Sequence, residues 1–301
     1  MKRILVIRLG ALGDFVLSFG PFAAIRAHHP DAEITLLTTA PFADLAGAVP
    51  WFDKIAIDAR PSWYDIPGLL HLRHQLAGFD FVYDLQTSGR SSRYFWLAGR
   101  PGWSGIAFGC SHPQSGPARH AMHTIERQQD QLRIAGITEF PRPDLHFLTT
   151  RPRPQLPQPY ALLVPGAALH RPDKRWPAER YGGLARELLA KGLTPVILGA
   201  IADKPLAAII MASCPAAIDL TGRTSIPDLF AIAADATIAI GNDTGPMHIA
   251  GAVGCRSLVL FSAASNPALT APRGPDGAWP IVLRAPVLAD LSLDRVVAAV
   301  A

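Results

Sequence analysis

The residues whose types and spacing suggest chemistry most directly form a polar turn at 241–248, with the sequence GNDTGPMH. The apolar run 236–240 precedes this turn and is typical of a buried strand. Small residues at 249–254 follow it and are typical of a helix that ends on glycine. A glycine-bearing turn between a strand and a helix directs backbone N–H groups and the positive end of the helix dipole toward one point. The arrangement therefore predicts a phosphate-binding turn.

Side chains in the same turn extend this prediction. Asp243, Thr244 and His248 can bind hydroxyl groups and phosphate oxygens. The alternative is an ordinary turn in which Asn242 and Asp243 cap the helix. Capping alone requires neither the paired glycines nor the histidine.

A second turn, at 10–14, follows the apolar run 3–7 and places Asp14 directly before a helix. The turn reads GALGD and is not the GxGxxG of a dinucleotide site. Asp14 could cap the helix. It could also be a general base, because a carboxylate within hydrogen-bond reach of a sugar hydroxyl can remove its proton as a new bond forms.

A third turn, at 165–177, contains Lys174 shortly before a predicted helix. A lysine in this place could neutralise the charge that develops on a departing diphosphate without a metal. A solvated surface loop is the alternative.

Basic residues of the N-terminal half form a further group. Between 60 and 153 every basic side chain other than histidine is an arginine, and guanidinium groups suit carboxylates and phosphates. The histidines nearby lack the spacing of metal ligands, so we expect no metal site. The residues that we assign to recognition of an anionic acceptor are Arg90, Arg93, His120 and His123.

The pattern of the whole chain predicts an α/β protein with mainly parallel sheets. Apolar runs alternate with segments of helical spacing. The strands expected are 3–7, 33–38, 54–57, 79–84, 160–164, 195–198, 236–240 and 257–261. The helices expected include 15–28, 177–191, 202–212, a segment from a capping box at 225–228 to 234, and 292–301. Because each half begins with strand, turn and helix, we expect two Rossmann-like domains that face each other across a cleft.

Four prolines lie between 150 and 159, where neither a helix nor a central strand is expected. We therefore place a linker at 151–159, between a first domain at 1–150, which contains the arginines assigned to an acceptor, and a second domain at 160–301, which contains two of the predicted phosphate-binding turns.

Composition limits the classes of function. The chain has 301 residues, 49% hydrophobic content and 17% charged residues, as a well-packed globular protein does. No apolar run approaches the ~20 residues needed to span a bilayer, and the three scattered cysteines suit free thiols in a reducing compartment. We expect a cytoplasmic protein, with peripheral contact at an anionic membrane surface as one option. The net charge of +4 comes without a basic helix or a stacking series, which disfavours nucleic acid as a partner.

Together these motifs resemble glycosyltransferase family 9, the bacterial lipopolysaccharide heptosyltransferases. The resemblance is carried by ILVIRLGALGD at 4–14, DKRWP at 173–177 and GNDTGPMH at 241–248, in the family's order. It implies the two-domain GT-B fold and inverting, metal-independent transfer of a heptose from an ADP-activated sugar to a lipopolysaccharide core or a similar anionic glycan. No cofactor is implied, because the nucleotide sugar is a substrate.

The resemblance also assigns roles to residues. Asp14 matches the catalytic base and Lys174 matches a phosphate-binding lysine. The positions that match the site for the donor diphosphate and sugar are Asp243, Thr244, Gly245 and His248. Met247 and Gly166 are assigned to the nucleotide.

The chain departs from the family at 10–11 and 167–168, where it lacks the hydroxyl residues that many members have. Backbone N–H groups would have to contact phosphate there. Three other functions stay open: a nucleotide-sugar epimerase, a non-catalytic nucleotide-sugar binding protein, and a dehydrogenase, the last weakened by the missing GxGxxG.

Overall fold

The computed structural model describes residues 1–168 and 171–300, and the chain forms two compact units, Met1–Asp144 and Leu145–Ala301. The proline-rich segment 151–159 belongs to the second unit and contains neither helix nor strand. No helix within the described ranges is long and apolar enough to cross a membrane.

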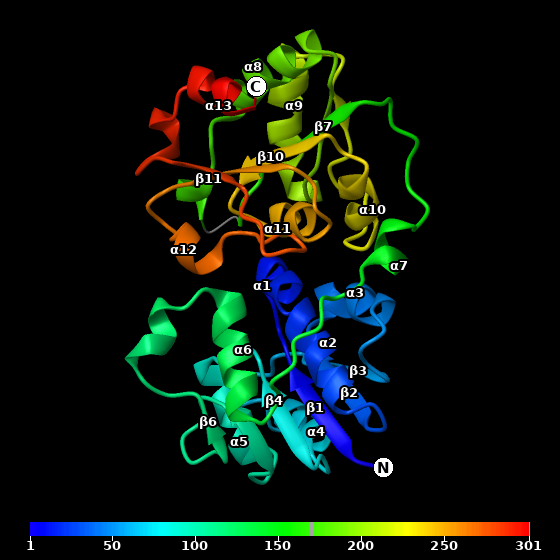
Figure 1. Cartoon of the computed structure of the whole chain (residues 1–301), viewed down its shortest axis with the longest axis vertical. Coiled ribbons are helices and arrows are strands. Elements are labelled where there is room, and N and C mark those ends of the chain that lie inside the picture. The colour runs from blue at the N-terminus through cyan, green and yellow to red at the C-terminus, as the bar shows by residue number, and fades with distance from the viewer. Residues whose placement is uncertain (169–170, 301) are drawn as a thin grey trace. The chain divides into compact units, whose positions relative to one another are not determined.

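The first unit is built on a parallel sheet in the order β3-β2-β1-β4-β5-β6 (Figure 1). Its strands are β1 (Arg3–Ile7), β2 (Glu33–Thr38), β3 (Lys54–Ile57), β4 (Phe81–Asp84), β5 (Gly102–Gly105) and β6 (His112–Pro113). Its helices are α1 (Leu12–Leu17), α2 (Phe19–His28), η1 (Ala40–Phe42), α3 (Ala43–Ala48), α4 (Ile66–Leu76), α5 (Gly89–Leu97), η2 (Pro117–Ala121) and α6 (Thr124–Ile134).

Helices cover both faces of this first sheet. Buried side chains of α4 and α5, such as Leu72 and Phe95, pack with Leu5 and Val82 of the central strands. On the other side α2 contacts α6 and α1. Central strands covered on both faces must be apolar throughout, which explains the run in β1.

The second unit repeats this topology in the order β12-β11-β10-β7-β8-β9, again with every pair parallel. Its strands are β7 (Tyr160–Val164), β8 (Thr194–Ile197), β9 (Ile218–Asp219), β10 (Ile238–Asn242), β11 (Ser257–Phe261) and β12 (Ile281–Arg284). Its helices are α7 (His146–Thr149), η3 (Pro172–Lys174), α8 (Ala178–Ala190), η4 (Ile201–Asp203), α9 (Lys204–Ser213), α10 (Asp228–Ala234), α11 (Gly245–Ala252), α12 (Pro267–Thr270), η5 (Leu288–Asp290) and α13 (Leu293–Val300).

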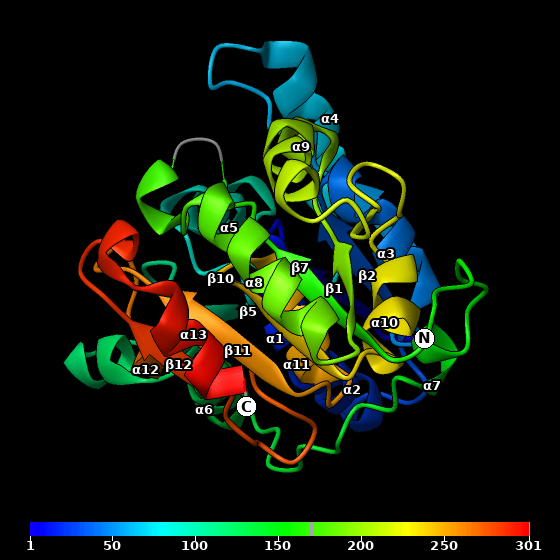
Figure 2. The ribbon, with the colours of Figure 1, turned by 90° about the horizontal axis from the view of Figure 1, so that it is seen from above.

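Helices α9, α8 and α13 lie side by side over one face of the second sheet (Figure 2). Two glycines of α8 permit this packing. A Cβ at Gly182 would lie 2.6 Å from Ser213 of α9, and one at Gly183 would lie 2.7 Å from Leu293 of α13. Helices α10 and α11 contact each other and lie on the opposite face (Figure 1).

Both sheets have the doubly wound order in which the first strand and the fourth lie side by side, and the predicted α/β class is confirmed. Several predicted strands have the observed bounds, among them 3–7, 33–38 and 54–57. The predicted terminal helix at 292–301 is observed as α13, and Ala301 lies outside the described residues.

One predicted helix, at 15–28, ends at the observed residue but is wrong in its start and its continuity. Helix α1 begins already at Leu12, and the path breaks at Ser18 before α2. The Ser18 hydroxyl donates to the carbonyl oxygen of Asp14 at 2.8 Å, which competes with regular helix bonding. Pro21 has no N–H with which to continue the ladder.

The strand expected at 236–240 is observed two residues later, as β10. The polar turn that follows it is correspondingly short. Asn242 is the last residue of the strand, and α11 begins at Gly245.

Candidate active site

Asp14 lies in the first turn of α1, just after the carboxyl end of β1. The N-cap of α1 is Ala11, so Asp14 does not cap the helix. Its side chain is 42% exposed, and its Oδ1 lies 3.3 Å from Nη2 of the buried Arg8. Arg8 Nη1 donates to the carbonyl oxygen of Leu85, after β4, at 2.5 Å. A buried guanidinium therefore fixes an accessible carboxylate, as a general base requires.

A hydrogen bond links the segments that follow β1 and β4, two neighbouring strands at the point where the strand order of the sheet reverses. Gln86 Oε1 accepts a hydrogen bond from the Leu9 N–H at 2.8 Å. The buried Asp84 accepts from the N–H groups of Gln86 at 3.1 Å and Thr87 at 3.0 Å. Burial raises the pKa of Asp84 to about 6, against the effect of these hydrogen bonds and of Arg8. Open α/β sheets bind ligands beyond the carboxyl ends of their strands at this point.

Two further arginines approach the same edge of the first sheet. Arg60 donates to the Leu9 carbonyl oxygen at 3.0 Å. Arg119 Nη2 donates to Thr87 Oγ1 at 2.7 Å and its Nε to Gln114 Oε1 at 3.1 Å. Burial lowers the pKa of Arg119. Residue types alone do not single out either arginine, because their partners Leu9 and Thr87 lie in loops that follow other strands.

Two of the predicted acceptor residues, Arg90 and Arg93, lie on α5. Arg90 contacts the Pro61 carbonyl oxygen at 3.2 Å and the Tyr94 hydroxyl at 3.2 Å, which fixes its orientation. Arg93 is exposed and stacks over Trp63, 4.8 Å from the ring centroid.

The two predicted histidines lie elsewhere in the first unit, near the start of α6. His120 is exposed in η2. His123 is buried, accepts a hydrogen bond from Ile125 N–H at 3.2 Å and lies 3.2 Å from Glu126. His123 thus already has a capping role, and the assignment of all four residues to an acceptor stays a prediction.

In the second unit, Lys174 and His248 converge on Asp243. Lys174 Nζ donates to Asp243 Oδ2 at 2.6 Å, and His248 Nε2 lies 3.9 Å from Asp243 Oδ1. Burial would raise the pKa of Asp243, but interactions with His248 and Lys174 outweigh burial and hold the pKa at about 2. The Lys174 side chain is 17% exposed, so its remaining N–H donors can reach a ligand.

The imidazole ring of His248 has a second polar atom, Nδ1, in addition to the Nε2 that faces Asp243. Its side chain is 6% exposed, and within residues 1–168 and 171–300 its Nδ1 has no hydrogen-bond partner. A buried polar atom without a partner is costly, which marks this position as one where a ligand can complete the bonding. The half-buried Thr244 and Gly245 lie beside it at the start of α11.

Asn242 holds these elements together at the reversal point of the second sheet. Its amide nitrogen donates to the carbonyl oxygens of Pro165 at 2.8 Å and Gly166 at 3.2 Å. Its Oδ1 accepts from Trp176 N–H at 3.1 Å and from the Tyr181 hydroxyl at 3.2 Å. Asn242 is therefore structural, and it positions the turn that contains Lys174.

The two residues assigned to the nucleotide have tightly packed surroundings. Met247 is fully buried, and a Cβ added at Gly241 would lie 2.7 Å from its sulfur. A Cβ at Gly166 would lie 2.6 Å from the Asp203 carboxylate. Both assignments stay predictions. The residues at 169–170, within the predicted turn at 165–177, lie outside the described residues.

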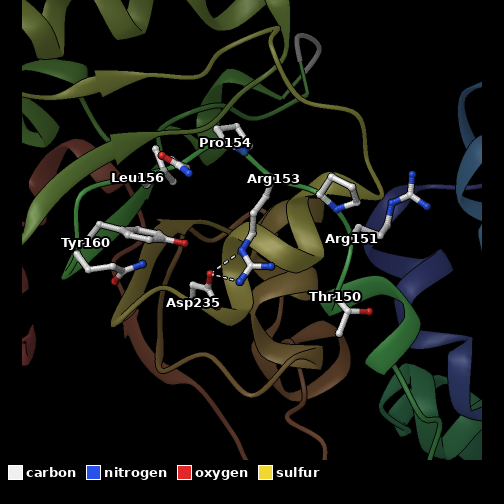
Figure 3. Close-up of a pocket in the computed structure, with 10 residues that line it drawn as sticks. Thr150, Arg151, Arg153, Pro154, Leu156, Tyr160 and Asp235 are labelled. Atoms are coloured by element: carbon white, nitrogen blue, oxygen red, sulfur yellow. Dashed lines mark hydrogen bonds and ion pairs between the residues drawn. The ribbon is translucent and has the colours of Figure 1, made fainter.

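A cavity of about 630 Å³ lies at the edge of the second sheet where β7 and β10 begin, opposite the edge that carries Asp243 (Figure 3). The proline-rich segment, Tyr160 at the start of β7, and Asp235 before β10 line it. Arg153 Nε and Nη2 both contact Asp235 Oδ2 at 2.6 Å. None of the residues gathered around Asp243 lines this cavity. In the described part of the chain no three His, Cys, Asp or Glu side chains are grouped to hold a metal ion.

Comparison with known proteins places this arrangement in a family. The sequence model described as "Glycosyltransferase family 9 (heptosyltransferase)" matches residues 69–278. The chain belongs to glycosyltransferase family 9.

Individual heptosyltransferases are similar to this chain over different lengths. Lipopolysaccharide heptosyltransferase 2 of Escherichia coli K12 is 26% identical over 303 residues, covering 90% of this chain and 85% of that protein. Lipooligosaccharide heptosyltransferase 2 of Haemophilus influenzae is 32% identical over 120 residues, covering 38% of this chain and only 34% of that protein. The solved structure of the E. coli ADP-heptose lps heptosyltransferase II has a TM-score of 0.75 at 22% identity, covering 100% of this chain and 97% of that chain.

These matches establish the GT-B fold and a glycosyltransferase enzyme of the heptosyltransferase family. The predicted fold and enzyme class are confirmed.

Proposed function

We propose that this enzyme transfers a heptose from an ADP-activated donor to a lipopolysaccharide core acceptor, with inversion at the anomeric carbon. The observation that carries the proposal is the convergence of Lys174 and His248 on Asp243 beside the start of α11. The names of the similar proteins support the substrates, since they include an ADP-heptose heptosyltransferase and lipopolysaccharide heptosyltransferases.

In the proposed reaction Asp14 accepts the proton of an acceptor hydroxyl. That oxygen forms a bond to the anomeric carbon from the face opposite the leaving group. The bond between that carbon and the phosphate oxygen breaks, and ADP leaves with its electron pair. Inversion follows from a single displacement of this kind.

Lys174 is proposed to neutralise the charge that develops on the departing diphosphate. Asp243 orients the Lys174 ammonium group at 2.6 Å, and the remaining donors of Lys174 serve phosphate oxygens. His248 Nδ1 is proposed to bond the donor sugar or its phosphate. No step requires a metal, so transfer is expected to persist in excess EDTA.

The direct test measures ADP release from ADP-heptose with and without a heptose-deficient lipopolysaccharide core, with UDP-activated and GDP-activated sugars as comparison donors. We expect release that depends on the acceptor and prefers the adenine nucleotide. NMR of the product is expected to show the inverted anomer. Conversion of the donor sugar without acceptor would favour an epimerase, and binding without turnover would favour a binding protein.

We place the proposed reaction at the cytoplasmic surface of the inner membrane, where a lipid-linked core would be accessible.

A further inference from the structure

Helix α4 in the first unit is apolar on two sides. Leu72 and Leu76 are buried against the sheet, at 1% and 0% exposure. Ile66 and Leu70, one helical turn apart, are each 60% exposed. Neighbouring apolar side chains in solvent are unusual on a helix that already buries its other face. They indicate that this face contacts another molecule or a membrane.

The loop before α4 and the adjacent α5 extend this exposed area. Trp63 is 40% exposed, Tyr64 88% and Trp96 48%. The loop is fastened to α5 because Arg90 donates to the Pro61 carbonyl oxygen at 3.2 Å. We call the resulting area the α4–α5 surface, which comprises Trp63, Tyr64, Ile66, Leu70, Arg93, Trp96 and Arg100.

Cations accompany the exposed rings. Arg93 lies over Trp63, and Arg100 lies 4.1 Å from the centroid of Trp96. Segments 61–76 and 89–100 together contain four arginines and a single carboxylate, Asp65. Asp65 accepts a hydrogen bond from Gly68 N–H at 3.0 Å as the cap of α4. The surface is therefore basic as well as apolar.

We infer that the α4–α5 surface docks on a lipid bilayer that carries anionic headgroups. Indole and phenol rings reside favourably at the boundary of water and lipid, and aliphatic side chains beside them enter the acyl region. Arginines bind lipid phosphates there, and each basic residue near such a membrane adds to the attraction. Charge complementarity thus favours an anionic membrane over a neutral one.

The topology relates this surface to Asp14. Helix α4 follows β3 and α5 follows β4, so both helices begin at the carboxyl edge of the parallel sheet, which is also the edge of Asp14. This part rests on the proposed function: a docked surface would hold a lipid-linked acceptor near that edge. Docking itself requires no turnover.

The test is co-sedimentation of the full chain, without nucleotide sugar, with vesicles of phosphatidylcholine alone or mixed with phosphatidylglycerol. We expect binding only to the mixed vesicles, weakened by added salt. The double variant Trp63→Ser/Leu70→Ser is expected to lower the partition coefficient by roughly tenfold or more, since two apolar side chains no longer enter the interface.

A matched pair of single variants controls for the loss of an exposed tryptophan. Trp96 and Trp279 are 48% and 51% exposed, and each lies under an arginine. Trp96→Ser is expected to weaken binding, and Trp279→Ser in the second unit is expected to leave it unchanged, with both variants melting cooperatively.

Three outcomes would overturn the inference: no binding to mixed vesicles, equal losses in Trp96→Ser and Trp279→Ser, or a dimer that the double variant dissociates while vesicles bind neither form. Turnover with a lipid-free core fragment is measured separately. A chain that binds vesicles but transfers no sugar would contradict the proposed function alone.

Discussion

Arg8 and Asp14 form an ion pair across the carboxyl end of β1, with Nη2 of the arginine 3.3 Å from Oδ1 of the aspartate. The two side chains differ greatly in exposure, at 4% and 42%. Burial lowers the pKa of Arg8, and the Asp14 carboxylate opposes this shift. The Leu85 carbonyl oxygen, after β4, holds the buried guanidinium, while the carboxylate stays open to solvent. Arg8 can therefore orient Asp14 as a base that a substrate can still reach.

Asp14→Asn tests the proposed base. The amide keeps the shape but cannot accept the hydroxyl proton, so kcat is expected to fall by roughly 10²- to 10⁴-fold with little change in donor KM. Asp44→Asn is the control, because Asp44 also lies in the first turn of a six-residue helix, α3. Steady-state kinetics with the lipopolysaccharide acceptor measure both, and near-normal transfer by Asp14→Asn would exclude it as the base.

Arg8→Met tests whether Arg8 positions Asp14. Methionine fills similar space without the guanidinium, so we expect kcat to fall by about tenfold and donor KM to stay constant. Arg8→Lys should recover part of the loss, since it restores a cation but not the fork that reaches Leu85. A parallel rise in donor KM would instead indicate general damage to the fold.

Lys174→Met tests the diphosphate site. Loss of one charge-assisted contact costs about 1.5–3 kcal/mol, so the dissociation constant for ADP is expected to rise about 10- to 100-fold. Lys204→Met is the matched control, because Lys204 forms a similar ion pair with Asp219 at 2.9 Å in the same unit. Calorimetric titration with ADP measures both, and equal weakening in the two variants would argue against a specific role for Lys174.

The sequence predicts the central elements of the fold well, because their signals are local. Strands such as β1 and β7 are continuous apolar runs, which buried parallel strands require. The sequence does not predict the short outer strands β5 and β6. Strand β5 has the sequence GWSG and β6 has two residues, and neither pattern differs from that of a loop.

The candidate site was predictable in its turns but not in its supports. Asp14, Lys174 and Asp243 stand out because polar residues follow apolar strands. The role of Asn242 depends on Pro165 and Tyr181, which are distant in sequence. Such partners follow from the order of strands in the sheet, and local patterns contain no information about that order.

Gly241→Ala tests the packing beneath the polar turn. The new methyl group would lie 2.6 Å from Val164 Cβ and 2.7 Å from Met247 Sδ. Both neighbours are buried, so the free energy of unfolding is expected to fall by about 1–3 kcal/mol. Gly20→Ala in α2 is the control, because no atom lies within 4 Å of its added Cβ. Urea unfolding measures both variants, and unchanged stability in Gly241→Ala would show that the turn can move aside.

The buried Asp84 predicts a pH dependence of stability. Its pKa is raised from 3.8 to about 6 by burial, so the folded state binds this proton more tightly than the unfolded state does. Its contribution to folding is therefore most favourable below pH ~4 and is lost as pH rises from ~4 to ~6, on the order of 3 kcal/mol in total.

Asp84→Asn isolates this contribution, since its amide oxygen can still accept from Gln86 and Thr87 N–H. His29, whose pKa burial lowers to about 4, acts in the same range with opposite sign, and Asp243 acts below pH ~4. Both cancel when the variant is subtracted from the wild type. Urea unfolding at pH 4.5 and pH 6.5 should show the variant gaining stability relative to the wild type at the higher pH. A difference that does not change with pH would mean that Asp84 titrates normally in the folded protein.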